Sequence, residues 1–266
     1  MSIRVGIGGW TFEPWRGVFY PSDLTQKREL EYASRKVTSI EINGTYYGSQ
    51  KPESFARWRA ETPDDFVFSV KGPRFTTNRR VLAEAGESID RFFKSGVLEL
   101  KEKLGPINWQ FATTKKFDPE DFEAFLKLLP QEAEGRAIRH LVELRHESFK
   151  VPEAIALMRR YGVAIVLTDS DEYPNIHDAT ASFVYLRLMQ ASEKARVGYT
   201  PTALGQWAKR AQEWAKGGAP SDLDLVAPQD GKAPKTRDVF VYFINGYKPK
   251  APAAAMAMIE LLNAAG

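Results

Sequence analysis

Short apolar runs alternate with longer amphipathic stretches from one end of the chain to the other. Each run is too short for a helix and is rich in β-branched or aromatic residues, so we expect strands. The eight runs cover residues 3–9, 37–43, 66–72, 106–111, 139–145, 163–169, 183–189 and 238–245. Helix-like stretches cover residues 26–36, 53–61, 84–104, the segment that begins after Asp118-Pro119, 152–161, 201–216 and 251–264. Eight strands, nearly all followed by a helix, predict one (β/α)8 TIM-type barrel domain over residues 1–266, and the length matches the ~250 residues typical of this fold.

The glycines of the first strand argue against a doubly wound, dinucleotide-binding sheet. In that fold an early glycine-rich turn opens directly into a helix. Here Gly6, Gly8 and Gly9 are followed by an aromatic loop with Trp10 and Trp15, which is not a helix start. The sequence therefore contains no organic-cofactor motif of this kind.

Residues 217–237 interrupt the alternation and are rich in Gly, Pro, Ser, Asp and Lys. They join the helix at 201–216 to the last strand, which places them at the N-terminal face of the barrel. A connection of this length without secondary structure of its own is uncommon in a compact domain. We expect a mobile loop that takes no part in catalysis.

Composition narrows the chemistry. The chain has no cysteine and three histidines, which excludes disulfides, thiolate nucleophiles and cysteine-ligated metals and gives no support to a histidine-rich metal site. Lys and Arg (37) barely outnumber Asp and Glu (34), so the net charge of +3 does not by itself indicate a nucleic-acid partner. The N-terminus does not resemble a signal peptide and no run reaches the ~20 apolar residues of a membrane span, so we expect a cytoplasmic protein.

Side-chain alternation along the strands predicts where the site lies. Apolar residues occupy the positions that face the helices, and polar residues occupy inward positions near the carboxyl ends of the strands. These polar residues are Glu41, Asn43, Ser69, Lys71, Asn108, Gln110, Glu143, Arg145, Asp169, Tyr185, Arg187 and Asn245. Barrel enzymes carry their active sites at this end. The alternative is a set of internal salt bridges that holds the mouth open.

The expected βα loops at the same end are more basic than the rest of the chain. Residues 71–80 contain four Lys or Arg and no acid, and Arg74 is a candidate for binding phosphate or carboxylate groups. Trp10 and Tyr46 would wall a pocket, although aromatics also simply pack loops onto a barrel rim. His146 follows Arg145 at a strand end, where we expect it to orient neighbours by hydrogen bonding.

Several motifs together resemble the YecE-like family, a group of unknown function. They are Gly-Gly-Trp with residues 15–21 (WRGVFYP), residues 40–47 (IEINGTYY), 66–74 (FVFSVKGPR), 142–146 (VELRH), 168–170 (TDS), 185–187 (YLR) and 242–245 (YFIN). The resemblance covers almost the whole chain and implies a (β/α)8 barrel. It implies no established reaction.

The chain departs from the family pattern at several positions. Asn78 and Met189-Gln190 stand where the family commonly has His and His-Gly, Ala112-Thr113 replaces a proline pair, and Ala251 replaces an asparagine. The missing histidines argue against histidine-dependent chemistry and against a histidine metal site, and we expect a divergent member with altered activity.

Three functional hypotheses follow. The first is an enzyme acting on a small anionic substrate, with Glu41 or Glu143 as general base, Lys71 as acid or Schiff-base lysine, and Asp169 in the catalytic set. Lyase, isomerase and hydrolase chemistry all stay open. The expected substrate-binding residues are Trp10, Asn43, Tyr46, Arg74, Gln110, Arg145, His146, Tyr185, Arg187 and Asn245.

The second hypothesis is a phosphodiester hydrolase or nucleic-acid-binding barrel that uses the basic loops, with Glu41, Glu143, Asp169 and His146 available to Mg²⁺ or Mn²⁺ through oxygen ligands. The acidic residues 169–178 oppose a continuous basic track, so this hypothesis ranks below the first. The third is a non-catalytic ligand-binding barrel. The sequence indicates no particular oligomeric state.

Overall fold

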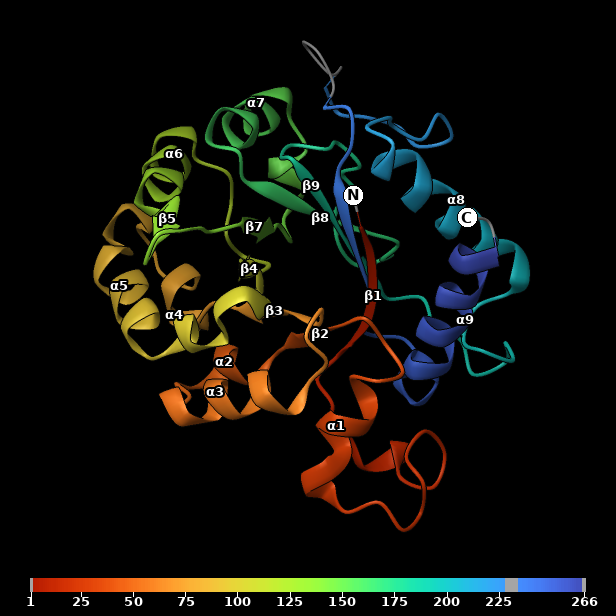
Figure 1. The fold of residues 1–266 in the computed structure, drawn as a ribbon. Helices are drawn as coiled ribbons and strands as arrows, with labels where there is room; N and C mark the ends of the chain where they lie inside the picture. The colour runs from red at the N-terminus through yellow and green to blue at the C-terminus, as the bar shows by residue number, and fades with distance from the viewer. Residues whose placement is uncertain (1, 228–233, 265–266) are drawn as a thin grey trace.

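Eight parallel strands close into a barrel that is surrounded by helices (Figure 1). The computed structural model describes residues 2–227 and 234–264. Around the barrel the strands follow the order β1-β10-β9-β8-β7-β4-β3-β2, so the last strand pairs with the first. The strands are β1 (Ile3–Gly8), β2 (Ser39–Ile42), β3 (Val67–Lys71), β4 (Leu104–Gln110), β7 (His140–Glu143), β8 (Ala164–Thr168), β9 (Phe183–Leu188) and β10 (Asp238–Phe243). The predicted (β/α)8 barrel is confirmed.

The outward faces of the strands form the main core with the helices. Ile40, Phe68 and Trp109 are fully buried in this layer, and Trp109 packs edge-on against aromatic rings of the helices, such as Phe92 at 5.6 Å between centroids. A second, smaller apolar cluster contains Leu141, Tyr185 and other residues of β7 to β10 and fills the barrel interior. Apolar side chains thus fill part of the interior, and the charged residues lie toward the carboxyl ends of the strands.

The helices begin largely where the sequence predicts. Asp118 caps the helix at 119–128 by accepting hydrogen bonds from the backbone N–H groups of Glu120 and Asp121, and Thr200 caps the helix at 201–215. The α-helices are α1 (Glu29–Ala33), α2 (Gly44–Tyr47), α3 (Pro52–Glu61), α4 (Arg74–Thr77), α5 (Gly86–Lys94), α6 (Pro119–Leu128), α7 (Pro152–Tyr161), α8 (Pro201–Ala215) and α9 (Ala251–Ala264). Short 3-10 segments are η1 (Glu13–Trp15), η2 (Gln26–Arg28), η3 (Leu82–Glu84), η4 (Val97–Lys103), η5 (Glu147–Phe149) and η6 (Lys248–Lys250).

Two predicted helices are shorter than expected. The stretch 26–36 forms η2 and then only α1, and the stretch 84–104 is divided into η3, α5 and η4. The break at Gly96 has a physical reason: its φ is +101°, and a Cβ there would lie 2.6 Å from the Cα of Pro52. The chain therefore turns at a glycine to pass close to the start of α3. A small antiparallel hairpin, β5 (Glu132–Ala133) and β6 (Arg136–Ala137), precedes β7.

The connection from β8 to β9 contains no helix. Within it Asp178 is fully buried and accepts hydrogen bonds from the backbone N–H groups of Val226 (2.8 Å) and Ala227 (2.9 Å). The described part of the segment 217–237 is therefore bound to this connection at residues 226–227. Residues 228–233 of the predicted mobile loop lie outside the described residues, and its mobility stays a prediction.

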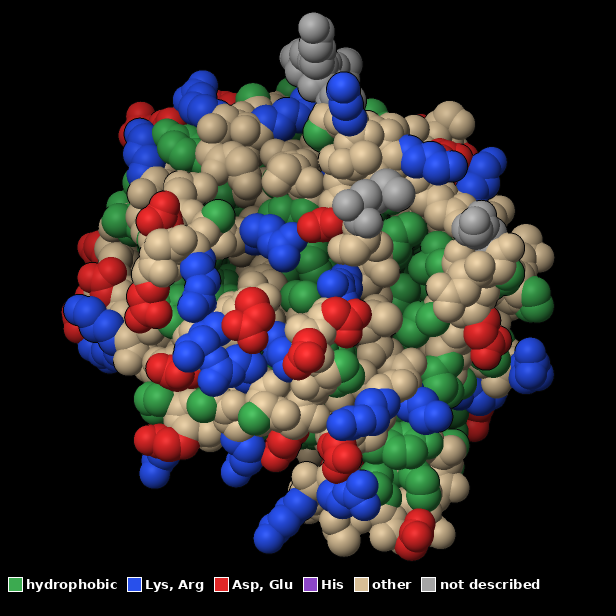
Figure 2. All heavy atoms as spheres, in the orientation of Figure 1, with side chains coloured by type: hydrophobic (Ala, Val, Ile, Leu, Met, Phe, Trp, Pro, Cys, Tyr) green, Lys and Arg blue, Asp and Glu red, His purple; other side chains and the backbone are tan. Residues whose placement is uncertain are grey.

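Acidic and basic side chains are interspersed on the face shown in Figure 2. Among the described residues, no helix is both long and apolar enough to cross a membrane.

Candidate active site

Three charged side chains meet inside the barrel near the carboxyl ends of the strands. Arg187 of β9 donates from Nη1 to Glu143 Oε1 of β7 at 2.7 Å and from Nη2 to Glu41 Oε1 of β2 at 3.2 Å. All three side chains are at most 4% exposed. The barrel brings them together because each occupies an inward position near the end of its strand.

Two further cations contact Glu143, one from the end of β3 and one from just beyond the end of β7. Lys71, the last residue of β3, lies with its Nζ 3.3 Å from Glu143 Oε2 and also donates to Gln110 Oε1. Arg145 donates from Nε to Glu143 Oε1 at 2.9 Å. Asn108 adds a hydrogen bond from its amide nitrogen to Glu143 Oε2 at 3.1 Å. Glu143 is thus the centre of the cluster.

Tyrosines line two sides of the charged cluster. Tyr185 Oη donates to Glu41 Oε2 at 2.7 Å and contacts Ser69 Oγ at 2.8 Å. The Tyr46 hydroxyl accepts a hydrogen bond from Gln110 Nε2 at 3.1 Å, and its ring centroid lies 5.4 Å from Lys71 Nζ. The site thus combines ionised groups with aromatic walls.

Burial and neighbouring charges shift the pKa values of Glu143, Lys71 and Arg187 in the cluster. Burial alone would raise the pKa of Glu143, but Arg187, Lys71 and Arg145 outweigh it and hold this pKa well below its usual range. Burial, with Arg187 nearby, lowers the pKa of Lys71 to about 8 although Glu143 and Glu41 act against this shift. For Arg187, burial is outweighed by Glu143 and Glu41, which raise its pKa above the ordinary value. Of these three groups, Lys71 therefore has the pKa nearest to neutral.

The cluster contains an excess of positive charge. Two carboxylates, Glu41 and Glu143, face three cations, Lys71, Arg145 and Arg187. Two buried atoms, Arg187 Nε and Asn108 Oδ1, have no hydrogen-bond partner among the described residues. Since unbalanced buried charge is costly, a bound anion would complement this arrangement.

Other predicted residues lie outside this cluster, and the alternation of side chains along the strands explains why. Thr168 pairs in register with Arg187 and takes the inward position at the end of β8, so Asp169 does not. Asp169 instead accepts hydrogen bonds from Met189 N and from Tyr199 Oη, at 2.5 and 2.8 Å. Burial raises its pKa, although the Met189 and Tyr199 hydrogen bonds act against this shift. The expectation that Asp169 faces the basic residues is wrong.

Three predicted substrate-binding residues also lie apart. His146 caps η5, with its Nδ1 accepting from Ser148 N at 3.1 Å, rather than orienting a Glu or Arg. Arg74 is exposed at the start of α4. Tyr242 and Ile244 belong to the interior cluster, so the alternation along β10 gives Asn245 no inward position, and it is exposed beyond the strand.

Two cavities lie at the mouth and share one lysine. The first, of about 330 Å³, is lined by Gly8, Trp10, Asn43 and Lys248 among others, and the second, of about 390 Å³, by Gln190, Asn245 and Lys248 among others. Gly8 is the register partner of Glu41, and Asn43 lies two residues beyond Glu41, so the first cavity lies one pleat above the charged cluster.

Lys248 is the principal residue that the sequence reasoning missed. It is half-buried, burial lowers its pKa, and its Nζ lies 4.5 Å from the ring centroid of Phe12. It has no carboxylate partner among the residues that the structure describes. The charge of its loop was visible in the sequence, but the position of this loop over the carboxyl end of β1 was not. The sequence analysis placed Asn108 and Ser69 inside the barrel but did not name them as site residues.

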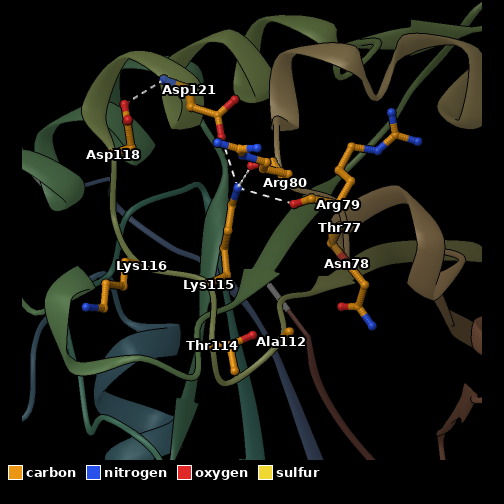
Figure 3. A pocket seen from close by; sticks show the side chains of 10 residues that line it. All are labelled: Thr77, Asn78, Arg79, Arg80, Ala112, Thr114, Lys115, Lys116, Asp118 and Asp121. Carbon is orange, nitrogen blue, oxygen red and sulfur yellow. Dashed lines mark hydrogen bonds and ion pairs between the residues drawn. The ribbon is translucent and has the colours of Figure 1, made fainter.

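A third cavity, of about 590 Å³, lies between the α4 segment and the loop before α6 (Figure 3). Asn78 and Ala112, two positions where the chain departs from the family pattern, line it, and Met189 and Gln190 line the second mouth cavity. In the described part of the chain, no three His, Asp or Glu side chains come together as potential metal ligands.

Comparison with known proteins agrees with the motifs. The family described as "Protein of unknown function DUF72" matches residues 4–266. The UPF0759 protein YecE of Escherichia coli K12 is 30% identical over 176 residues, which cover 63% of this chain and 59% of YecE. The chain therefore matches less than two thirds of the length of this relative.

Solved structures share the fold over nearly the whole chain. A DUF72 family protein from Thermotoga maritima is 23% identical with a TM-score of 0.76, covering 99% of this chain and 100% of that one. One from Enterococcus faecalis is 18% identical with a TM-score of 0.71, covering 98% of each chain. SacUVDE is 12% identical with a TM-score of 0.54, covering 98% of this chain and 99% of its own, a likeness of fold alone. The match over residues 4–266 shows that the chain is a member of the DUF72 family.

Proposed function

We propose that this protein is an enzyme that binds a small anionic substrate at the carboxyl-end mouth of the barrel and transfers a proton through Lys71. The observation that carries the proposal is the buried cluster of three cations and two carboxylates around Glu143. A barrel that needed only a packed interior would use apolar residues there. An anion supplies the negative charge that the cluster lacks.

Within this proposal Glu143 is a positioning residue and not the general base. Its low pKa makes it a poor proton acceptor, and its oxygens already contact Arg187, Lys71 and Arg145. Lys71, with a pKa of about 8, suits proton transfer near neutral pH. The role of Glu143 is to hold the Lys71 ammonium in place, and Glu41 shares Arg187 with it.

The mouth cavities supply the binding region of the proposal. Lys248 borders both and brings a positive charge without a carboxylate partner in the described chain. Trp10 and Asn43 line the first cavity, as expected for substrate-binding residues. One anionic group of the substrate would contact Lys248 while its reactive part faces the cluster below.

The test begins with a panel of small carboxylates and phosphorylated compounds. Native-state ligands raise the melting temperature. Each stabilising compound is then followed by proton NMR in D2O for conversion or for exchange of a carbon-bound hydrogen. We expect Lys71→Met to lose the reaction but to keep a reduced thermal shift, because the cluster loses its excess positive charge while Lys248 stays in place. The wild-type rate is expected to change with pH around 8.

Lys103→Met is the matched control. Lys103 is a buried lysine that donates to the carbonyl oxygens of Arg59 (2.7 Å) and Thr62 (2.8 Å), near the start of β4 and away from the mouth. Assayed below its melting temperature, it is expected to react like the wild type. An unchanged rate in Lys71→Met refutes the role of Lys71. Thermal shifts without any reaction in the wild type would indicate a non-catalytic binding barrel, and a panel without thermal shifts would refute the anion site.

A further inference from the structure

The 590 Å³ cavity beside the mouth is a distinct basic pocket. It is lined by two segments, one from Thr77 to Arg80 after β3 and one from Ala112 to Asp121 after β4. Four cations, Arg79, Arg80, Lys115 and Lys116, and two acids, Asp118 and Asp121, line it. The lining therefore carries an excess of two positive charges.

Both acids of the pocket are already engaged. Asp118 accepts hydrogen bonds from backbone N–H groups at the start of α6. Asp121 accepts one from the backbone N–H of Ala83 at 3.0 Å and pairs with Lys115 Nζ at 3.0 Å. Both carboxylates are therefore bound to other groups, and neither forms an ion pair with Arg80 or Lys116.

Two of the four cations are structural. Lys115 Nζ also donates to the carbonyl oxygens of Arg79 (3.4 Å) and Arg80 (2.7 Å), which joins the two walls of the pocket (Figure 3). Arg79 donates to Glu84 O and to Ser88 Oγ, and its side chain points away from Lys115 in Figure 3. Arg80 and Lys116 are exposed, and their side chains have no hydrogen-bond or ion-pair partner within the described chain. A braced pocket thus presents two free cations.

The pocket is connected to the proposed reaction centre. Thr77, on its wall, donates from Oγ1 to the backbone oxygen of Gln110, and the side chain of Gln110 contacts Lys71 Nζ. Asn78 and Thr114 add an amide and a hydroxyl group to the lining. This combination of guanidinium, ammonium, hydroxyl and amide donors suits the oxygens of a phosphate group.

We propose that this pocket binds the phosphate of a small phosphorylated molecule, which makes a phosphorylated compound the substrate class. Phosphate binding depends only on the pocket, whereas its assignment to the substrate rests on the function proposed above. Arg80 provides a fork for two phosphate oxygens and Lys116 provides a point charge.

Pyrophosphate and inorganic phosphate are the probes, titrated by calorimetry into the full chain at moderate salt. We expect one pyrophosphate site whose affinity falls at least about tenfold in Arg80→Gln/Lys116→Gln. The control is Lys94→Gln/Arg136→Gln, which removes two exposed cations from segments that precede β4 and β7, at the opposite end of the barrel. It is expected to bind like the wild type.

An unchanged affinity in Arg80→Gln/Lys116→Gln, or an equal loss in the control, overturns the proposal. A short oligothymidylate that competes with pyrophosphate and binds far more tightly would also overturn the assignment to a small molecule. Lys71→Met separates the two proposals: retained pyrophosphate binding supports the pocket even where the reaction assay fails. Lost pyrophosphate binding in Lys71→Met would place the anion at the central cluster instead.

Discussion

Replacing Arg187 with methionine is expected to remove the central link of the buried cluster. Methionine fills much of the same space without charge. Glu143 would keep Lys71 and Arg145 as partners, but Glu41 would keep only the Tyr185 hydroxyl at 2.7 Å within the described chain. The variant therefore leaves one fully buried carboxylate without a cation.

The magnitude follows from burial. Removing one partner of a buried ion pair costs about 3–5 kcal/mol, because the other charge is left uncompensated. For a domain of this size that loss lowers the melting temperature by roughly 6–20 °C. Adding Glu41→Gln in the Arg187→Met background is expected to recover about 1–3 kcal/mol, because the uncompensated charge is then gone.

The assay is urea unfolding at pH 7, followed by tryptophan fluorescence and circular dichroism, for the wild type, both single variants and the double variant. Arg139→Met is the control, because the Arg139–Asp238 pair (3.1 Å) is one-third exposed and is expected to contribute at most about 1 kcal/mol. A loss in Arg187→Met no larger than in this control would refute the reasoning. So would a double variant no more stable than Arg187→Met.

Three further predictions follow from other contacts. The pKa of Lys71 is about 8 in the folded state against 10.5 ordinarily, so between these pH values the unfolded chain binds more protons than the folded one. The free energy of unfolding of the wild type should therefore rise with pH in this range. Lys71→Met should flatten this rise, and parallel pH profiles of the two proteins would contradict the prediction. Asp178→Ala is expected to cost about 2–4 kcal/mol and to speed amide hydrogen exchange at Val226 and Ala227, whereas unchanged exchange would show that Asp178 does not hold this segment. Gly246→Ala should destabilise the protein by more than about 1 kcal/mol, because the φ of Gly246 is +75° and a Cβ there would meet the backbone of Ala191. Gly9→Ala should cost less, because Gly9 has a similar φ of +72° but open space around it. Equal melting temperatures of the two variants would contradict this contrast.

The centre of the site was predictable because its residues lie within regular strands. Alternation with a period of two places Glu41, Lys71, Glu143 and Arg187 inside the barrel, and the structure brings all four into one network. The same alternation gives the inward positions to Thr168 and Ile244, the neighbours of Asp169 and Asn245. The placement of Asp169 and Asn245 inside the barrel was wrong because it followed their position at the strand ends and not the alternation.

The predicted lengths of two helices were wrong for a reason that also lies outside the local sequence. The pattern at 84–104 is continuous in the sequence, and the break at Gly96 reflects a close approach of Pro52, which comes from a distant segment. The same holds for the β8–β9 connection, whose buried Asp178 is held by residues 226–227. Local patterns carry no information about such neighbours.

By itself the sequence determined the class of fold, the eight strands and the charged side chains that line the interior, because hydrophobic periodicity is a local property of each strand. Only the tertiary structure decided which charges meet, that Lys71 is desolvated, that Lys248 returns to the mouth, and that Arg80 and Lys116 share a braced pocket. Those outcomes depend on loops from distant parts of the chain, and their positions are set by packing and by burial of charge rather than by the residues nearest in sequence.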